Sequence, residues 1–227
     1  MQTTKNIVTH WRAWLLLAAT ALAFGLIATA QSPDTNETGS AINPSAVPDS
    51  KDLQVGSISG KVSAGKGVSV VWVEAVPGMA SPKPAKPFAL SQKSLRFEPH
   101  ILAVPVGATV DFQNNDSVQH NIFWPAINGN KKLGHTLGTY PRGQTRVYQF
   151  DTAGIVPLLC NVHPEMSAYV IVTPTPYMAQ TDDSGSFKIS DVPDGSYTLT
   201  AWHEGLKSQS KPVTVASDAK IDFTLAK

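Results

Sequence analysis

The residues best suited to chemistry are concentrated in one short stretch, 160–166. It reads Cys-Asn-Val-His-Pro-Glu-Met and holds the single cysteine of the 227-residue chain. Cys160 is followed by His163 after three positions and by Met166 after six. Thiolate and thioether sulfur favour Cu(I), and imidazole binds copper in both oxidation states. The stretch therefore predicts a copper ion that changes its charge by one electron.

A further ligand is expected from outside this stretch. His120 ends the run Asn-Asn-Asp-Ser-Val-Gln-His, which begins at residue 114 and lies about forty positions upstream of Cys160. Two histidines, one cysteine and a weakly bound methionine make the trigonal site of electron-transfer copper proteins. The alternative is that the cysteine is a small buried hydrophobe, as free cysteines often are. Export would count against that alternative, because oxidising compartments normally use cysteines in pairs.

These residues resemble the cupredoxins, the type I blue copper proteins of the amicyanin-like and plastocyanin-like kind, and the C-x-x-H-P-x-M spacing is most similar to the short ligand loop of the amicyanins. The resemblance covers about residues 88–173 and includes Phe97-x-Pro99, Val104-x-x-Gly107, Val110-x-Phe112-x-Asn114 and His120-Asn121. It implies one type I copper per chain, with three equatorial ligands and an axial one. These are His120, Cys160 and His163 in the plane and Met166 on the axis.

The same resemblance implies two supporting residues. The Asn121 side chain would tie the His120 segment to the Cys160 loop, and its backbone N–H would point toward the cysteine sulfur. Pro164 would remove one donor and stiffen the loop beside His163. Hydrogen bonds at the sulfur tune the reduction potential of such a site.

The composition predicts an all-β chain. Charged residues make up only 15%, and 16 glycines and 17 prolines interrupt many short apolar runs. In residues 88–173 we expect strands over 97–104, 109–113, 145–150, 155–159 and 168–172, and a long polar loop over 126–143. The fold expected there is a Greek-key cupredoxin β-sandwich. The last two strands would carry three of the ligands on the loop between them.

A second, smaller sandwich is expected from residues 55–78 and 175–227 together. Its motifs are Gly56-x-Ile58-x-Gly60-x-Val62, Thr181-Asp-x-x-Gly-x-Phe187 and Val192-Pro-x-Gly-x-Tyr197. They resemble the carboxypeptidase regulatory-like domain, a prealbumin-like β-sandwich. Neither fragment alone has enough strands for a core of normal size. We therefore expect the copper domain to be inserted in a loop of this sandwich, although two domains in linear order remain an alternative.

The N-terminus predicts export. Lys5 and Arg12 precede a continuous run of apolar or small residues from 13 to 30, which ends in the small-x-small pattern of a signal-peptidase site. We expect cleavage near residue 30 and a periplasmic or otherwise exported protein. An uncleaved membrane anchor is the alternative. Residues 31–54 are polar and rich in turn formers, and predict a flexible linker.

Charge and histidine content limit the function. Loss of residues 1–30 leaves 16 basic and 17 acidic residues, a net charge of −1, and no basic stripe indicates a nucleic-acid partner. The expected function is a one-electron carrier or relay with an unidentified redox partner protein and no enzymatic activity. A multicopper oxidase or a copper nitrite reductase needs extra histidines, and the chain has six in all. A periplasmic copper-binding or chaperone protein is the main alternative, and an adhesion module is another.

The remaining histidines are weaker candidates. His100 follows a proline on an expected strand and is interpreted as a surface or packing residue. His135 lies in the expected polar loop, where a second metal site or a gating role is the alternative to no role. His203 follows a tryptophan in the second sandwich and is interpreted as structural.

Overall fold

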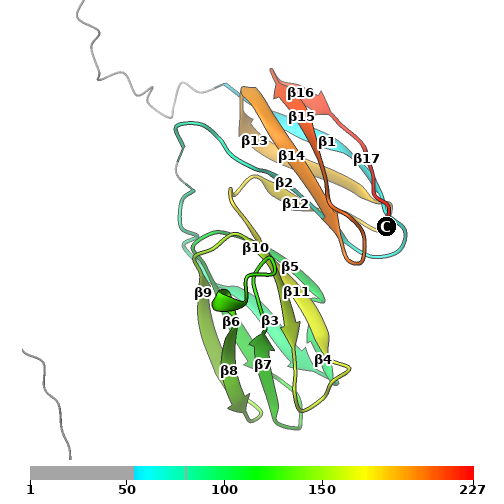
Figure 1. The fold of residues 1–227 in the computed structure, drawn as a ribbon. Helices are drawn as coiled ribbons and strands as arrows, with labels where there is room; N and C mark the ends of the chain where they lie inside the picture. The colour runs from blue at the N-terminus through cyan, green and yellow to red at the C-terminus, as the bar shows by residue number, and fades with distance from the viewer. Residues whose placement is uncertain (1–53, 80) are drawn as a thin grey trace, which may run out of the picture. The chain divides into compact units, whose positions relative to one another are not determined.

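The computed structural model describes residues 54–79 and 81–227. The expected signal segment 1–30 and residues 31–53 of the expected linker lie outside the described residues. Within them every regular element is a strand except the short 3-10 helix η1 (Lys131–Leu133). The all-β prediction is confirmed. The strands form four sheets, which build two sandwiches (Figure 1).

The central sandwich comprises residues 88–173. One of its sheets has the order β4-β3-β6-β9 and the other the order β5-β11-β10-β7-β8. The strands are β3 (Phe88–Lys93), β4 (Arg96–Glu98), β5 (Ile101–Pro105), β6 (Ala108–Asn114), β7 (His120–Trp124), β8 (His135–Tyr140), β9 (Thr145–Phe150), β10 (Gly154–Leu159) and β11 (Ser167–Thr173).

Alternating side chains explain how these sheets pack. In β6, Ala108, Val110, Phe112 and Asn114 are buried, and the residues between them are partly exposed. Successive side chains of a strand point to opposite faces, so this pattern directs one face of β6 into the core. The core between the two sheets includes Trp124, Tyr140 and Phe150, and it also includes Cys160 and Met166. The proposed sulfur ligands are therefore held by the packed interior.

The flanking sandwich comprises residues 55–73 and 178–224. Its strands are β1 (Val55–Ser63), β2 (Ser69–Val73), β12 (Met178–Gln180), β13 (Ser186–Pro193), β14 (Gly195–His203), β15 (Gln209–Val215), β16 (Asp218–Lys220) and β17 (Phe223–Thr224). β1 pairs with β13, β16 and β17, and β2 pairs with β12 and β14. The strands of this sandwich thus come from both ends of the described chain, and β3–β11 pair among themselves.

The structure differs from the expected strands in three places. The region 126–143 is not a continuous loop, because it holds η1 and the edge strand β8, which pairs with β7. The expected strand 97–104 is divided into β4 and β5, which lie in different sheets. β3, β7 and β12 were not expected as strands. β12 has only three residues, and β7 is buried along most of its length, so neither shows the clear two-residue alternation that identifies a strand.

A small cluster of buried side chains joins the two sandwiches, which belong to one compact unit. Ile101, Ala103 and Ile171 of the central sandwich pack against Val70 and Trp202 of the flanking sandwich. The amide of Gln180 also donates a hydrogen bond to the carbonyl of Ile101 at 3.2 Å. The strands β5 and β11 therefore lie between their own core and the second sandwich.

Candidate metal centre

Two paired strands position the stretch that carries the cysteine. β10 and β11 are antiparallel, and their last pair joins Leu159 to Ser167. Residues 160–166 form the loop between these two ends. β10 also pairs with β7 through Leu159 and Phe123, which brings the start of β7 beside the loop. Because His120 is the first residue of β7, the strand order brings it next to Cys160.

Three of the four predicted ligands meet. One ligand atom each from His120, Cys160 and His163 lies within 4.8 Å of the others. The two Nδ1 atoms of His120 and His163 are 2.9 Å apart, and Cys160 Sγ is 4.0 Å from His120 Nδ1. Metal bonds of about 2.0 to 2.3 Å place two donors on one ion at most about 4.6 Å apart. These two separations are therefore compatible with a single ion.

Burial differs among the three residues. His120 and Cys160 are almost fully covered, with exposed fractions of 0% and 3%, whereas His163 is partly exposed. A buried thiol close to two imidazoles is a donor set that suits copper better than it suits a hard cation. Of these three residues, His163 is the one that reaches the surface.

Met166 lies in the same core cluster as Cys160 and is 1% exposed. Its backbone N–H donates to the carbonyl of His163 at 3.0 Å, which turns the chain sharply between the two residues. This turn lets Met166 enter the core while His163 stays near the surface. The family resemblance implied Met166 as the axial ligand; the structure buries it in the core cluster that also holds Cys160.

The predicted role of Asn121 has a counterpart in the structure. The backbone N–H of Asn161 donates to Asn121 Oδ1 at 2.7 Å, so the Asn121 side chain joins the His120 strand to the cysteine loop. Asn121 is 5% exposed. Pro164 lies exposed in the loop, directly after His163.

Sequence reasoning missed the role of Asp116. Its Oδ2 atom lies 3.1 Å from His120 Nε2, and it also accepts from the backbone N–H of Leu95 at 2.8 Å. The hydrogen bond from Leu95 is the largest influence that lowers the pKa of Asp116; those from Ser117 and His120 act in the same direction, and desolvation opposes them. An ionised Asp116 would fix the orientation of the His120 ring and leave Nδ1 free for a metal.

Asn114 holds the segment that leads to His120. Its side chain donates to the carbonyls of Val118 at 2.9 Å and Tyr140 at 3.0 Å, and accepts from the N–H of Asp116 at 2.9 Å. Asparagine and aspartate after a strand often make such local bonds. The run Asn-Asn-Asp was therefore a signal for this loop, although not for the contact between Asp116 and His120.

Tyr140 covers the group from β8. It pairs with His120 across the strands and is fully buried. Burial raises the pKa of its hydroxyl, the nearby Arg146 opposes this, and Cys160 adds to it. The hydroxyl donates to the carbonyl of Phe112 at 3.3 Å. Tyr140 thus excludes water from the interior side of the group and stays neutral.

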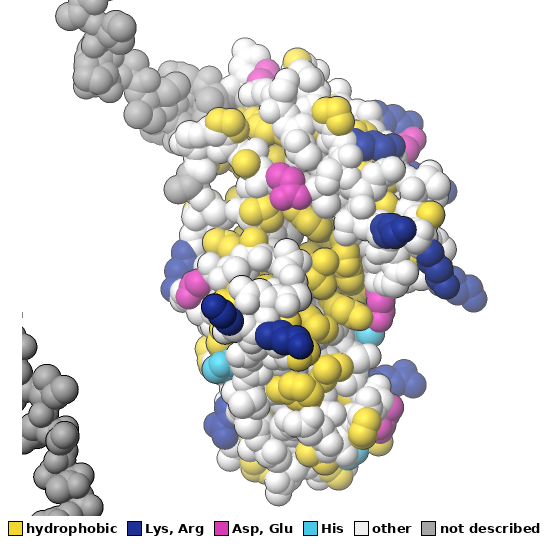
Figure 2. Space-filling model, in the orientation of Figure 1, with side chains coloured by type: hydrophobic (Ala, Val, Ile, Leu, Met, Phe, Trp, Pro, Cys, Tyr) yellow, Lys and Arg dark blue, Asp and Glu magenta, His cyan; other side chains and the backbone are white. Residues whose placement is uncertain are grey.

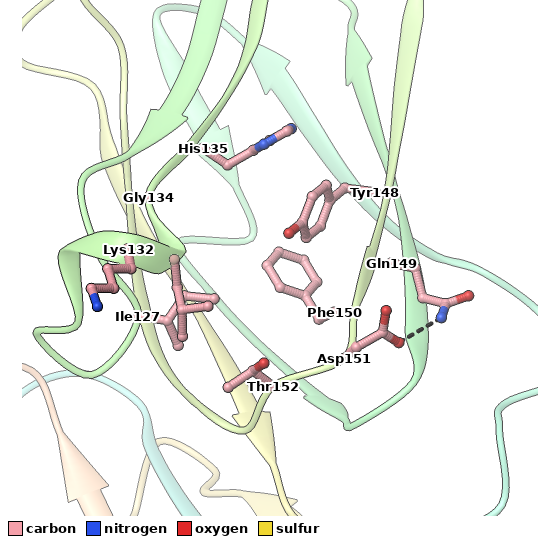
Figure 3. A pocket seen from close by; sticks show the side chains of 10 residues that line it. Ile127, Lys132, Gly134, His135, Tyr148, Gln149, Phe150, Asp151 and Thr152 are labelled. Carbon is pink, nitrogen blue, oxygen red and sulfur yellow. Dashed lines mark hydrogen bonds between the residues drawn. The ribbon is translucent and has the colours of Figure 1, made fainter. Parts of the chain in front are cut away.

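His135 lies away from the metal group, at the other end of β7. Its ring packs against Trp124 and Tyr148, with centroid distances of 5.2 and 4.8 Å. It lines a hollow of about 240 Å³ together with Phe150 and Asp151, in which the aromatic side chains face one another (Figure 3). Three ligand-type side chains do not converge there among the described residues, so the structure does not bring His135 into a second metal group.

The face of the molecule drawn in Figure 2 carries little organised charge. On the face drawn in Figure 2, hydrophobic side chains are frequent, and lysine and arginine are scattered rather than gathered in a stripe. In the part of the chain that the structure describes, no helix is long and apolar enough to cross a membrane.

Comparison with protein families matches residues 155–223 to polysaccharide lyase family 4, domain II. This is not the carboxypeptidase regulatory-like family that the turn motifs resembled. Those motifs describe tight turns between strands, which unrelated small β-sandwiches share, so they identify an architecture better than a family. A comparison with curated proteins finds no match.

Solved structures of cupredoxins resemble parts of the chain. The purple cupredoxin of Nitrosopumilus maritimus is 26% identical, and the match covers 38% of this chain and 99% of that one at a TM-score of 0.35. A reduced amicyanin variant is 24% identical, with 39% and 84% covered and a TM-score of 0.36. A copper-containing nitrite reductase of Thermus scotoductus is 22% identical, with 44% and 25% covered and a TM-score of 0.36.

Proposed function

We propose that the protein is an exported type I copper protein that carries or relays single electrons. The observation that supports this most is the convergence of His120, Cys160 and His163 on one point, with Met166 buried in the same core. Copper bound there would supply reversible one-electron chemistry. The four side chains would be one type I site per chain, with Met166 as its axial ligand.

The way the ligands are held supports electron transfer rather than metal delivery. His120 begins a strand and is fixed by Asp116, and the cysteine loop is fixed at Leu159, Ser167 and Asn161. A site that keeps its geometry in both oxidation states needs little rearrangement when the electron moves. A copper chaperone, the alternative function, needs exposed ligands that exchange readily, but His120 and Cys160 are buried.

An exit route for the electron is available at His163. The imidazole is partly exposed, and the neighbouring loops expose two apolar side chains, Val118 at 41% and Val162 at 48%. Apolar side chains around an exposed ligand would allow a partner to approach closely without a strong, long-lived complex. We propose that a redox partner protein docks on this part of the surface.

The strand pairing supports the further proposal that the central sandwich is an insertion. β1 and β2 share sheets with β12–β17, and the sequence between β2 and β12 holds the whole of β3–β11. The ends of an inserted domain must lie close together, as domain termini often do. The linear alternative assigns β1 and β2 to the copper domain, with which they share no sheet.

Copper titration of the whole secreted chain, followed by voltammetry, tests the proposed function. We expect one copper per chain, a reversible one-electron wave and slow loss of the metal to a chelator. Rapid exchange without a reversible wave would favour the chaperone function. More than one tightly bound copper per chain would favour an enzyme with a second copper site.

A further inference from the structure

The flanking sandwich contacts the central sandwich close to Ser167, the residue that follows Met166. His100, between β4 and β5, places Nδ1 3.0 Å from the carbonyl oxygen of Ser167. Its other nitrogen, Nε2, lies 2.7 Å from Oε2 of Glu204, which directly follows β14 in the flanking sandwich. One imidazole thus links the start of β11 to a carboxylate of the second sandwich.

Both neighbours of this imidazole are acceptors. The carbonyl of Ser167 and the carboxylate of Glu204 can only receive hydrogen bonds, so both ring nitrogens must donate for the link to be complete. The link is then an imidazolium between a carbonyl and a carboxylate, and the bond to the carboxylate is charge-assisted. The carboxylate therefore fixes the ring plane, and the ring fixes the Ser167 carbonyl.

The backbone reinforces the same contact. The N–H of Tyr169 donates to the carbonyl of His100 at 2.8 Å, so His100 holds β11 by both its backbone and its side chain. The Tyr169 ring packs against Trp202 of the flanking sandwich at a centroid distance of 5.3 Å. Burial raises the pKa of Tyr169, and the nearby carboxylate of Glu204 raises it further. Tyr169 and His100 therefore both lie where the two sandwiches meet, beside Glu204.

We propose that His100 is a positioning residue through which Glu204 of the flanking sandwich fixes the Met166–Ser167 segment. This inference rests on the proposed function, because its consequence is the placement of the axial sulfur at copper. It gives the flanking sandwich a role in setting the reduction potential. A looser Met166 donates less to copper, which favours Cu(I), so loss of the link raises the potential.

Exposure separates this role from a structural one. The side chains of His100 and Glu204 are 49% and 39% exposed, and an ion pair this accessible contributes little to folding stability. Charges near the ring are also mixed, because Arg96 and Glu165 line a hollow with His100 and Met166. Removal of the link should therefore change the potential and leave the thermal midpoint almost unchanged.

Two substitutions in the full copper-loaded chain distinguish positioning from simple electrostatics. Glu204→Gln removes a negative charge, and His100→Phe keeps an aromatic ring but removes the positive charge. If charge alone acts, Glu204→Gln raises the potential and His100→Phe lowers it. If the link positions Met166, both raise the potential, and the double variant shifts it no further than the larger single change. Opposite shifts, or none, overturn the proposal.

Glu74→Gln is the matched control. It makes the same chemical change in the flanking sandwich, and the Glu74 side chain has no hydrogen bond or ion pair with another described residue. We expect its potential to equal that of the unaltered chain. A shift as large as that of Glu204→Gln would show that any lost carboxylate in this sandwich acts, which overturns the specific role of His100.

A measurement on the metal-free chain separates this proposal from the proposed function. Amide exchange at Met166 and Ser167 should become faster in His100→Phe and in Glu204→Gln than in Glu74→Gln. If the chain binds no copper but exchange responds in this way, the proposed function fails and the link stands. If copper binds reversibly and exchange is unchanged, the link fails and the proposed function stands.

Discussion

The clasp between Asn121 and Asn161 offers a sharp test of how the two ligand segments are joined. Asn121 is 5% exposed, and its Oδ1 atom accepts the Asn161 N–H at 2.7 Å. Asn121→Ala removes the acceptor, and the partly covered N–H loses its partner. No other side-chain acceptor for this N–H is present among the described residues. The two ligand segments would then be joined only by the strand pair and by packing.

The expected loss of stability in Asn121→Ala follows from the burial of this hydrogen bond. An unsatisfied buried donor costs about 1 to 3 kcal/mol in the free energy of unfolding. Because the acceptor is buried and the donor only partly so, we expect about 2 kcal/mol. In a domain of the size of the central sandwich, residues 88–173, each 1 kcal/mol lost from the free energy of unfolding lowers the thermal midpoint by about 4–8 °C. A decrease of roughly 8–16 °C is therefore expected.

Urea unfolding of the metal-free chain measures this loss directly, without any contribution from copper. Asn115→Ala is the control, because it removes the same amide from an exposed position where Nδ2 bonds Ser91. Surface changes of this kind usually stay within about 0.5 kcal/mol. If Asn121→Ala destabilises the protein no more than Asn115→Ala does, the clasp does not join the segments and this reasoning is wrong.

Three further changes test other parts of the account. Met166→Leu should keep the colour of the copper-loaded protein and raise its reduction potential in voltammetry, because an apolar side chain replaces the thioether; an unchanged potential would exclude Met166 as axial ligand. Ile122→Ala should lower the free energy of unfolding by about 2–5 kcal/mol, because Ile122 is fully buried, whereas Val147→Ala, at a residue 60% exposed, should have little effect; equal effects would contradict the assigned core. The hydrogen bond from the Ser184 side chain, with those from backbone N–H groups, lowers the pKa of Asp182, so its contribution to stability is present above about pH 4 and is lost as the pH falls through the lowered value. Urea midpoints of the unaltered chain and Asp182→Asn should therefore converge in acid, and parallel curves would contradict this.

The ligand group could be predicted from the sequence because its residue types are rare and closely spaced. Cys160, His163 and Met166 lie in a single loop, so the sequence placed them near one another without knowledge of the fold. His120 was harder, since its meeting with Cys160 depends on β7 pairing with β10. The motif around His120 supplied that link through resemblance, and the structure brings the two residues together.

Other parts depend on contacts that no local pattern encodes. Asp116 reaches His120 only because the loop held by Asn114 turns back toward the start of β7. The bridge from His100 to Glu204 joins residues 104 positions apart. The strand β8 was missed because five of its six residues are exposed or partly exposed, so the two-residue alternation that identifies a strand is absent.

The visible spectrum of the copper-loaded chain tests the central claim most directly. A bond between the Cys160 thiolate and copper should produce a strong charge-transfer band, with narrow copper hyperfine splitting in the electron-spin spectrum. Cys160→Ser should abolish this band, and His135→Ala, a change outside the ligand group, should leave it intact. A band that persists in Cys160→Ser would contradict the assignment of Cys160 as a ligand and, with it, the proposed copper centre.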